Sequence, residues 1–123
     1  IALGEAIKQA LGDKAGIVRF GSSLLPMDES LIRCVIDLSG RPYLVFNEEF
    51  NNDRVGDFDT EMVKEFFYAV SYSSMMTLHI DELHGENSHH VIEATFKAFG
   101  RALKEAVSKD AKIKGVLSTK GSL

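Results

Sequence analysis

The sequence contains few residues that break or cross-link a chain. Among 123 residues there are two prolines, one cysteine and no tryptophan. Because Cys34 has no partner for an internal disulfide, the sequence favours a reducing compartment or a buried thiol. No apolar run approaches the ~20 residues that span a bilayer, and no secretory signal pattern opens the sequence. We therefore expect a soluble, cytoplasmic protein with no membrane partner.

Positive charge is also scarce. Lysine and arginine number 14 against 18 aspartates and glutamates, which gives a net charge of -4. A nucleic-acid partner is disfavoured, because binding to phosphate backbones requires an electropositive face. The hydrophobic share of 45% and the charged share of 26% are typical of one globular domain. A chain of this length can bury roughly two thirds of its unfolded surface, so we expect one core.

The first eleven residues resemble a segment near the C-terminus. When the chain is shifted by 96 positions, residues 1–11 align with residues 97–107, and five of the eleven pairs are identical. Apolar residues at helical spacing, followed by Gly12, predict a helix here. Because this helix starts at Ile1 without a capping residue, we expect further sequence upstream. Alanine-rich helices also match by chance, so the pattern alone leaves a duplication open.

Period-two alternation predicts several strands. Residues 31–38 place apolar side chains on one face, and residues 76–81 do the same. The turn at 39–42 leads into a strand at 43–47, which is a hairpin-like signal. A short strand is expected at 17–21. The segment after it, which contains Pro26, is expected to be a loop over 22–28.

Two further helices are expected. Asp57 or Asp59 can cap a helix whose apolar side chains are Met62, Val63, Phe66, Phe67 and Val70. The last helix follows residues 87–88 and runs to about Val107, with Ile92, Phe96, Phe99 and Leu103 expected to be buried. Strands paired in sequence and followed by helices predict an α+β fold, an antiparallel sheet with helices packed on one face.

The last helix begins with two adjacent histidines and a glutamate, in the pattern HHxxE. Neighbouring helical residues point about 100° apart, so His89 and His90 do not easily bind one ion but can each bind a different one. Glu93 lies one turn further on, within reach of either. Imidazole with carboxylate suits Mn(II), Fe(II) or Zn(II). The alternative is a solvated polar first turn. The other histidines, His79 and His84, are expected to be structural or incidental.

Three other features bear charge in unusual places. Arg19 lies in an otherwise apolar strand and Arg41 in a tight turn, which suggests anion capture, although surface arginines are common. The run Ser118–Gly121 combines hydroxyls, a flexible backbone and an ammonium group that can hold phosphate. Such tails are also often disordered. Glu65 flanks an apolar helix stripe, where a solvated carboxylate is the ordinary interpretation.

Four motifs together resemble one known family. The segments at 37–43, 55–60, 85–99 and 118–121 resemble imidazoleglycerol-phosphate dehydratase, and the likeness spans essentially the whole chain. The resemblance implies a duplicated α+β half-domain in which each half carries an HHxxE motif. It also implies two Mn(II) ions per complete active site and a homo-oligomer, a 24-subunit shell with sites between subunits.

The resemblance further implies boundaries along this chain. Residues 1–14 would be the end of the first-repeat helix and residues 15–107 the second α+β repeat. Residues 108–123 would be a polar tail with phosphate-binding residues. The strands and metal ligands of the first half are then expected to lie outside this sequence.

Site residues carried over from the resemblance fall into two groups. The metal ligands would be Glu65, His89, His90 and Glu93, and the position of Glu65 is histidine in some members. The groups that bind the substrate phosphate would be Arg19, Arg41, Lys97, Ser118, Thr119 and Lys120.

The implied reaction is a carbon–oxygen lyase step of histidine biosynthesis. D-erythro-imidazole glycerol phosphate would lose water to give imidazole acetol phosphate, by way of a metal-stabilised imidazolate, with Glu93 as a catalytic residue that helps to move protons. The alternative is a catalytically incomplete fragment that only folds, assembles or binds metal.

Overall fold

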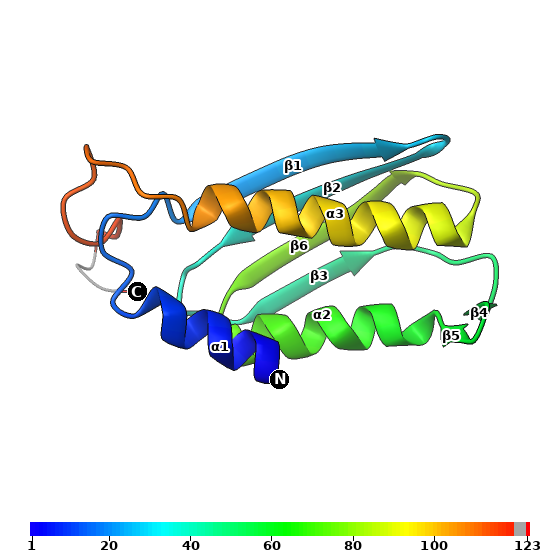
Figure 1. The fold of residues 1–123 in the computed structure, drawn as a ribbon, viewed down its shortest axis with the longest axis horizontal. Helices are drawn as coiled ribbons and strands as arrows, with labels where there is room; N and C mark the ends of the chain where they lie inside the picture. The colour runs from blue at the N-terminus through cyan, green and yellow to red at the C-terminus, as the bar shows by residue number, and fades with distance from the viewer. Residues whose placement is uncertain (120–122) are drawn as a thin grey trace.

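The computed structural model describes residues 1–119 and residue 123, and within them three helices lie on one face of a four-stranded sheet (Figure 1). The helices are α1 (Ala2–Leu11), α2 (Glu61–Ser74) and α3 (Ser88–Ala106). The sheet strands are β1 (Phe20–Met27), β2 (Ser30–Asp37), β3 (Tyr43–Asn47) and β6 (Thr77–His84). The short strands β4 (Arg54–Val55) and β5 (Phe58–Asp59) pair separately. This α+β architecture confirms the predicted fold class.

The alternating segments form the middle of the sheet. In β2 and β6, the side chains that face the helices are fully buried: Ile32, Cys34, Ile36, Leu78 and Ile80. Their neighbours in sequence point to the opposite face, as the pleat of a strand requires. The prediction for residues 76–81 is confirmed on both faces, and Met76 is buried as well.

The strand order corrects the predicted hairpin at residues 31–47. The order is β1-β2-β6-β3, so β6 lies between the two strands that were expected to pair. β6 runs antiparallel to β2 and parallel to β3. The turn at 39–42 thus begins a crossover rather than a hairpin, because the apolar β6 is buried best in the centre of the sheet.

The expected loop at 22–28 is also wrong. The segment belongs to β1, which pairs with β2 along its whole length, and Pro26 lies opposite Leu31. β1 is an edge strand, and proline is tolerated there because one side of the strand needs no hydrogen-bond donors. The short strand expected at 17–21 accordingly begins only at Phe20, while Ile17 forms an isolated bridge with Lys109.

The last helix has the predicted bounds to within one residue, but it buries a different face. A row of fully buried alanines at four-residue spacing faces the sheet: Ala94, Ala98, Ala102 and Ala106. Of the four side chains expected to be buried, only Phe99 is; Phe96 is exposed, and Ile92 and Leu103 are half-buried. Small side chains let α3 approach β1 so closely that the Ser23 hydroxyl donates to the carbonyl oxygen of Ala98 at 2.6 Å.

The other two helices pack together beside α3. The N-cap residue of α2 is Thr60, which makes no side-chain cap bond, and not the predicted Asp57 or Asp59. Asp59 does accept the backbone N–H of Glu61, at 3.0 Å. Phe67 is fully buried and its ring contacts that of Phe99 in α3, with centroids 5.3 Å apart. α1 packs on α2, where a side chain at Gly4 would overlap Ser73.

The segment after α3 turns back beside the residues that lead into β1. The backbone N–H of Val18 donates to Ser108 and that of Asp110 donates to Gly16. These bonds tie the beginning of residues 108–119 to the entry of β1. Among the described residues, no helix has both the length and the apolar character needed to cross a membrane.

A substitution at Gly21 tests the close approach of α3 and β1. A methyl group at this position would overlap the carbonyl oxygen of Ala102, which is backbone and cannot turn away. We expect Gly21→Ala to lower the free energy of unfolding by about 1–3 kcal/mol, the usual cost of overpacking. Denaturant titration followed by circular dichroism measures it.

Gly100→Ala is the matched control. Gly100 lies in α3 with nothing near its missing side chain, so alanine should leave the stability unchanged or raise it by about 1 kcal/mol through helix propensity. Equal effects of the two substitutions would contradict the proposed contact.

Candidate functional site

The first turn of α3 presents both histidines of the HHxxE motif. Asn87 has an extended backbone and caps the helix, because its side-chain oxygen accepts the N–H of His90 at 3.1 Å. The two imidazole rings lie 6.3 Å apart between centroids and are inclined by 61°. They therefore point in different directions, as the helical spacing predicts.

His89 is the more exposed of the two, and it pairs with Glu93. Its Nε2 lies 3.3 Å from Oε2 of Glu93, and Oε1 of Glu93 lies 2.8 Å from the ammonium group of Lys97. The hydrogen bond from Lys97 is the main reason that the pKa of Glu93 is lowered. Glu93 thus stands as a carboxylate between one imidazole and one lysine.

His90 is held by the turn between β1 and β2. Its Nδ1 lies 2.5 Å from Oε1 of Glu29, while Nε2 is 3.7 Å from Asp28. The bond to Glu29 raises the pKa of His90. In turn, hydrogen bonds from Ser30 and then His90 lower the pKa of Glu29. The sequence analysis missed Glu29, because it lies 61 positions from His90 and only the hairpin brings the two together.

The remaining predicted ligand stays apart from these groups. Glu65 lies exposed in the second turn of α2. Among the described residues, no cluster of three or more histidine, cysteine, aspartate or glutamate side chains is close enough to hold a metal ion. His79 lies within β6, and His84 ends that strand with an exposed side chain.

A cavity opens beside the start of α3. It has a volume of about 420 Å³ and is bounded by the β3–α2 connection and by the residues that precede the helix. Its lining comprises Asn51, Asn52, Arg54, Val55, Glu86, Asn87, Ser88 and His89. A small polar molecule placed there would lie against His89.

The residues predicted to bind the substrate phosphate lie away from the first turn of α3. Arg19 has a backbone φ of 78°, a conformation unfavourable for any residue but glycine. Its guanidinium binds Asp37 at 2.7 and 3.2 Å and donates to the carbonyl oxygen of Leu117 at 2.7 Å. The last of these bonds holds Leu117, the residue before Ser118 and Thr119, at Arg19, while Lys120 lies outside the described residues.

Arg41 lies exposed in the connection from β2 to β3, at the same end of the sheet as Arg19 (Figure 1). Lys97 does not join them, because it lies midway along α3 and pairs with Glu93. The start of α3 and the β1–β2 turn are at the opposite end of the fold. A helix of 19 residues measures roughly 28 Å at 1.5 Å per residue. One copy of the chain therefore does not bring the histidine pair and the two arginines together.

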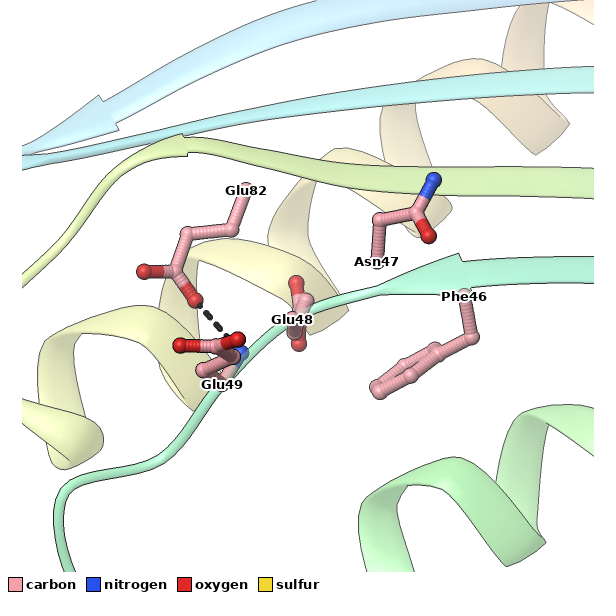
Figure 2. Close-up of a pocket in the computed structure, with 5 residues that line it drawn as sticks. All are labelled: Phe46, Asn47, Glu48, Glu49 and Glu82. Atoms are coloured by element: carbon pink, nitrogen blue, oxygen red, sulfur yellow. Dashed lines mark hydrogen bonds between the residues drawn. The ribbon is translucent and has the colours of Figure 1, made fainter.

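A second cavity, of about 430 Å³, lies where β3 ends and holds three glutamates (Figure 2). Glu82 reaches from β6 and accepts the backbone N–H of Glu49 at 3.1 Å. Glu48 follows β3 directly, and its Oε1 is buried without a hydrogen-bond partner among the described residues. Sequence reasoning missed this cluster, because Glu48 and Glu49 stand in an unremarkable polar stretch.

The environment of Glu48 favours its protonated form. Burial raises the pKa of Glu48 to about 7. The Thr95 hydroxyl lies 2.5 Å from Oε2 of Glu48 and 2.7 Å from the carbonyl oxygen of Val91. A hydroxyl carries one hydrogen, so it cannot donate to both oxygens at once. A protonated Glu48 resolves this conflict, because its Oε2 donates to the Thr95 hydroxyl while that hydroxyl donates to the carbonyl oxygen of Val91.

Comparison with known proteins gives one consistent result. A model of the family described as imidazoleglycerol-phosphate dehydratase matches residues 1–103. Over all 123 residues the chain is 59% identical to the imidazoleglycerol-phosphate dehydratase of Lachnoclostridium phytofermentans and 60% identical to that of Listeria monocytogenes serotype 4a.

Two solved structures are also similar. The imidazoleglycerol-phosphate dehydratase from Staphylococcus aureus subsp. aureus N315 covers 89% of this chain with a TM-score of 0.87 and 49% identity. IGPD from Pyrococcus furiosus in complex with (S)-C348 covers 100% of it with a TM-score of 0.88 and 37% identity. The chain spans 63% of the length of the two curated relatives and 64% and 66% of the two solved chains.

The raised pKa of Glu48 predicts that the stability of the fold depends on pH. Its folded-state pKa of about 7 lies above the ordinary value of 4.5, so the folded chain binds the extra proton and loses stability as pH rises through this range. We expect the free energy of unfolding to fall by roughly 1–3 kcal/mol between pH 5 and pH 8 relative to Glu48→Gln, whose amide replaces the protonated carboxyl. Urea titrations across that range measure the difference. The control is Glu49→Gln, in the exposed neighbouring residue, and its stability should depend on pH as that of the parent does. If the stability of the parent, Glu48→Gln and Glu49→Gln depended on pH in the same way, the raised pKa of Glu48 would be refuted.

Proposed function

Because this chain belongs to the imidazoleglycerol-phosphate dehydratase family, we propose that it takes part in the dehydration of D-erythro-imidazole glycerol phosphate to imidazole acetol phosphate in histidine biosynthesis. The observation that carries this proposal is the capped first turn of α3, which directs two imidazoles outward in different directions beside a carboxylate. The activity is proposed for the full length that the relatives have, of which this chain covers 63%.

The donor chemistry of this turn fits a divalent metal. Imidazole nitrogen with carboxylate oxygen suits Mn(II), the ion proposed here at two per complete site. His89, His90, Glu93 and Glu65 would hold the ions. A histidine whose Nδ1 is engaged by a carboxylate offers Nε2 as a ligand, and His90 has this arrangement with Glu29. When bound, the metal supplies Lewis acidity toward the nitrogens of the substrate ring.

The chain's own groups would bind and position the substrate. Arg19 and Arg41 would bind the phosphate, together with Lys97, Ser118, Thr119 and Lys120, because guanidinium and ammonium groups form charge-assisted hydrogen bonds with phosphate oxygens. The bond from Arg19 to the carbonyl oxygen of Leu117 supports this proposal, since it brings the tail to the arginine. Glu93 would move a proton at Oε2, because Lys97 already engages its Oε1.

The distance between the two ends of the fold supports a shared site. The histidine pair and the two arginines lie at opposite ends of one copy, so a complete site requires groups from another copy or from further sequence (Figure 1). We propose a homo-oligomer, a 24-subunit shell, in which one copy supplies the metal ligands and a neighbour supplies arginines. Residues 1–14, 15–107 and 108–123 would be the end of the first-repeat helix, the second repeat and the tail.

A second candidate is a chain that folds, assembles or binds metal without turnover. The observation that favours it is the absence, within the described residues, of any cluster of three or more ligand side chains. The two candidates differ in whether substrate is converted once the rest of the protein is supplied.

His89→Ala separates these candidates. We expect the chain, combined with the rest of the length that its relatives have and with Mn(II), to convert imidazole glycerol phosphate. His89→Ala should lower Mn(II) affinity and the rate by at least about 100-fold, because loss of a ligand costs no less than loss of a supporting group. Product formation and electron paramagnetic resonance of free Mn(II) measure both. His84→Ala, in an exposed histidine outside the motif, should behave like the parent. If the complete assembly binds Mn(II) without turnover, the second candidate holds.

A further inference from the structure

Glu29 contacts both the metal motif and the backbone that leads into it. It lies in the tight turn between β1 and β2, next to Asp28, whose φ is 50°. Its Oε1 is 2.5 Å from Nδ1 of His90. Its Oε2 accepts three hydrogen bonds, from the Ser30 hydroxyl at 2.6 Å and from the backbone N–H groups of Glu86 and Asn87 at 3.1 and 3.2 Å.

This arrangement fixes which nitrogen of His90 carries hydrogen. Three donors converge on Oε2 of Glu29, so the carboxyl group acts there as an acceptor and has no room for a hydrogen of its own. Hydrogen bonds donated to a carboxyl group favour its ionised form, so Oε1 also accepts and the hydrogen of the contact belongs to Nδ1 of His90. In a neutral imidazole with hydrogen on Nδ1, the lone pair is on Nε2.

His89 is held in another way. Its partner is Glu93, which approaches Nε2 from the same helix and is itself paired with Lys97. Glu93 can move away from Nε2 of His89 by a side-chain rotation. Glu29, in contrast, is fixed by three hydrogen bonds from groups that lie outside α3. The two imidazoles of the motif therefore differ, one held from within the helix and the other by the hairpin.

We propose that Glu29 is a positioning residue that accepts the Nδ1–H of His90 and so presents Nε2 of that imidazole as the metal-binding atom. The inference rests on the proposed function for the identity of the metal, but the hydrogen-bond arrangement itself does not depend on a metal. Carboxylates that hold the second nitrogen of a histidine ligand fix its tautomer and ring orientation, and their loss typically lowers metal affinity by about 10–100-fold.

The substitution Glu29→Gln reverses the arrangement. The three donors around Oε2 require the amide oxygen at that position, which directs the amide NH2 toward Nδ1 of His90. An NH2 group donates, so Nδ1 must become the acceptor and the hydrogen must move to Nε2. The predicted consequence is a change of tautomer with little change of shape.

The test combines two measurements. Long-range nitrogen–proton NMR of the metal-free chain identifies the tautomer of His90, which should be Nδ1–H in the parent and Nε2–H in Glu29→Gln. Titration with Mn(II) alone, followed by electron paramagnetic resonance on the chain combined with the rest of the length that its relatives have, should give an affinity about 10–100-fold lower for the variant. Glu86→Gln is the control, because its side chain is exposed and only its backbone binds Glu29. Circular dichroism establishes that each variant is folded.

Each outcome decides the proposal. An Nε2–H tautomer in the parent, an unchanged tautomer in Glu29→Gln, or equal Mn(II) affinity in parent and variant would overturn it. If the tautomers behave as expected but the parent binds no Mn(II), the proposed function fails and so does any role of Glu29 toward a metal, while the tautomer assignment remains. Glu29→Ala serves as a second variant if Glu29→Gln does not fold, and it should lose the Nδ1–H preference.

Discussion

The close packing of α3 on the sheet is the constraint on which the rest of the structure depends. The buried alanine row has the four-residue spacing of one helix face, and it allows the helix backbone to approach β1 and β2. Gly21 lies against the helix backbone because it has no side chain, and the Ser23 hydroxyl donates a hydrogen bond to a carbonyl oxygen of the helix. A helix held this closely cannot slide or rotate without breaking these contacts, so its first turn has a fixed place.

That fixed place brings together residues from distant parts of the sequence. The β1–β2 turn lies beside the start of α3, and Glu29 there joins the hairpin to the helix through His90 and Asn87. At the far end of α3, the chain returns beside Arg19 and ties the tail to it. The fold thus has two polar ends with different chemistry, imidazole and carboxylate at one and guanidinium at the other. A site built from both kinds of group therefore requires groups from another copy or from further sequence.

Sequence patterns predicted the elements that alternate strongly and the motifs that are contiguous. The strand at 76–81, the helix α2 and the position of His89 and His90 in a first helical turn all follow from local rules. The patterns failed where the outcome depends on packing between distant segments. The place of β6 between β2 and β3 depends on which strand is best buried in the sheet. The buried face of α3 was predicted wrongly because its larger apolar residues lie beside the alanine row and not in it. Glu29 and Glu48 acquire their roles only from partners brought near by the fold.

We propose that the first turn of α3 presents Nε2 of His90, whose Nδ1 is held by Glu29, to a metal ion that also binds groups from outside this copy. An anomalous-difference map at the manganese edge tests it most directly, from crystals of the chain combined with the rest of the length that its relatives have. The account predicts manganese at bonding distance from Nε2 of His90, with a ligand from outside this copy in the same coordination sphere. Manganese bound through Nδ1 of His90, or bound only away from the start of α3, would contradict it.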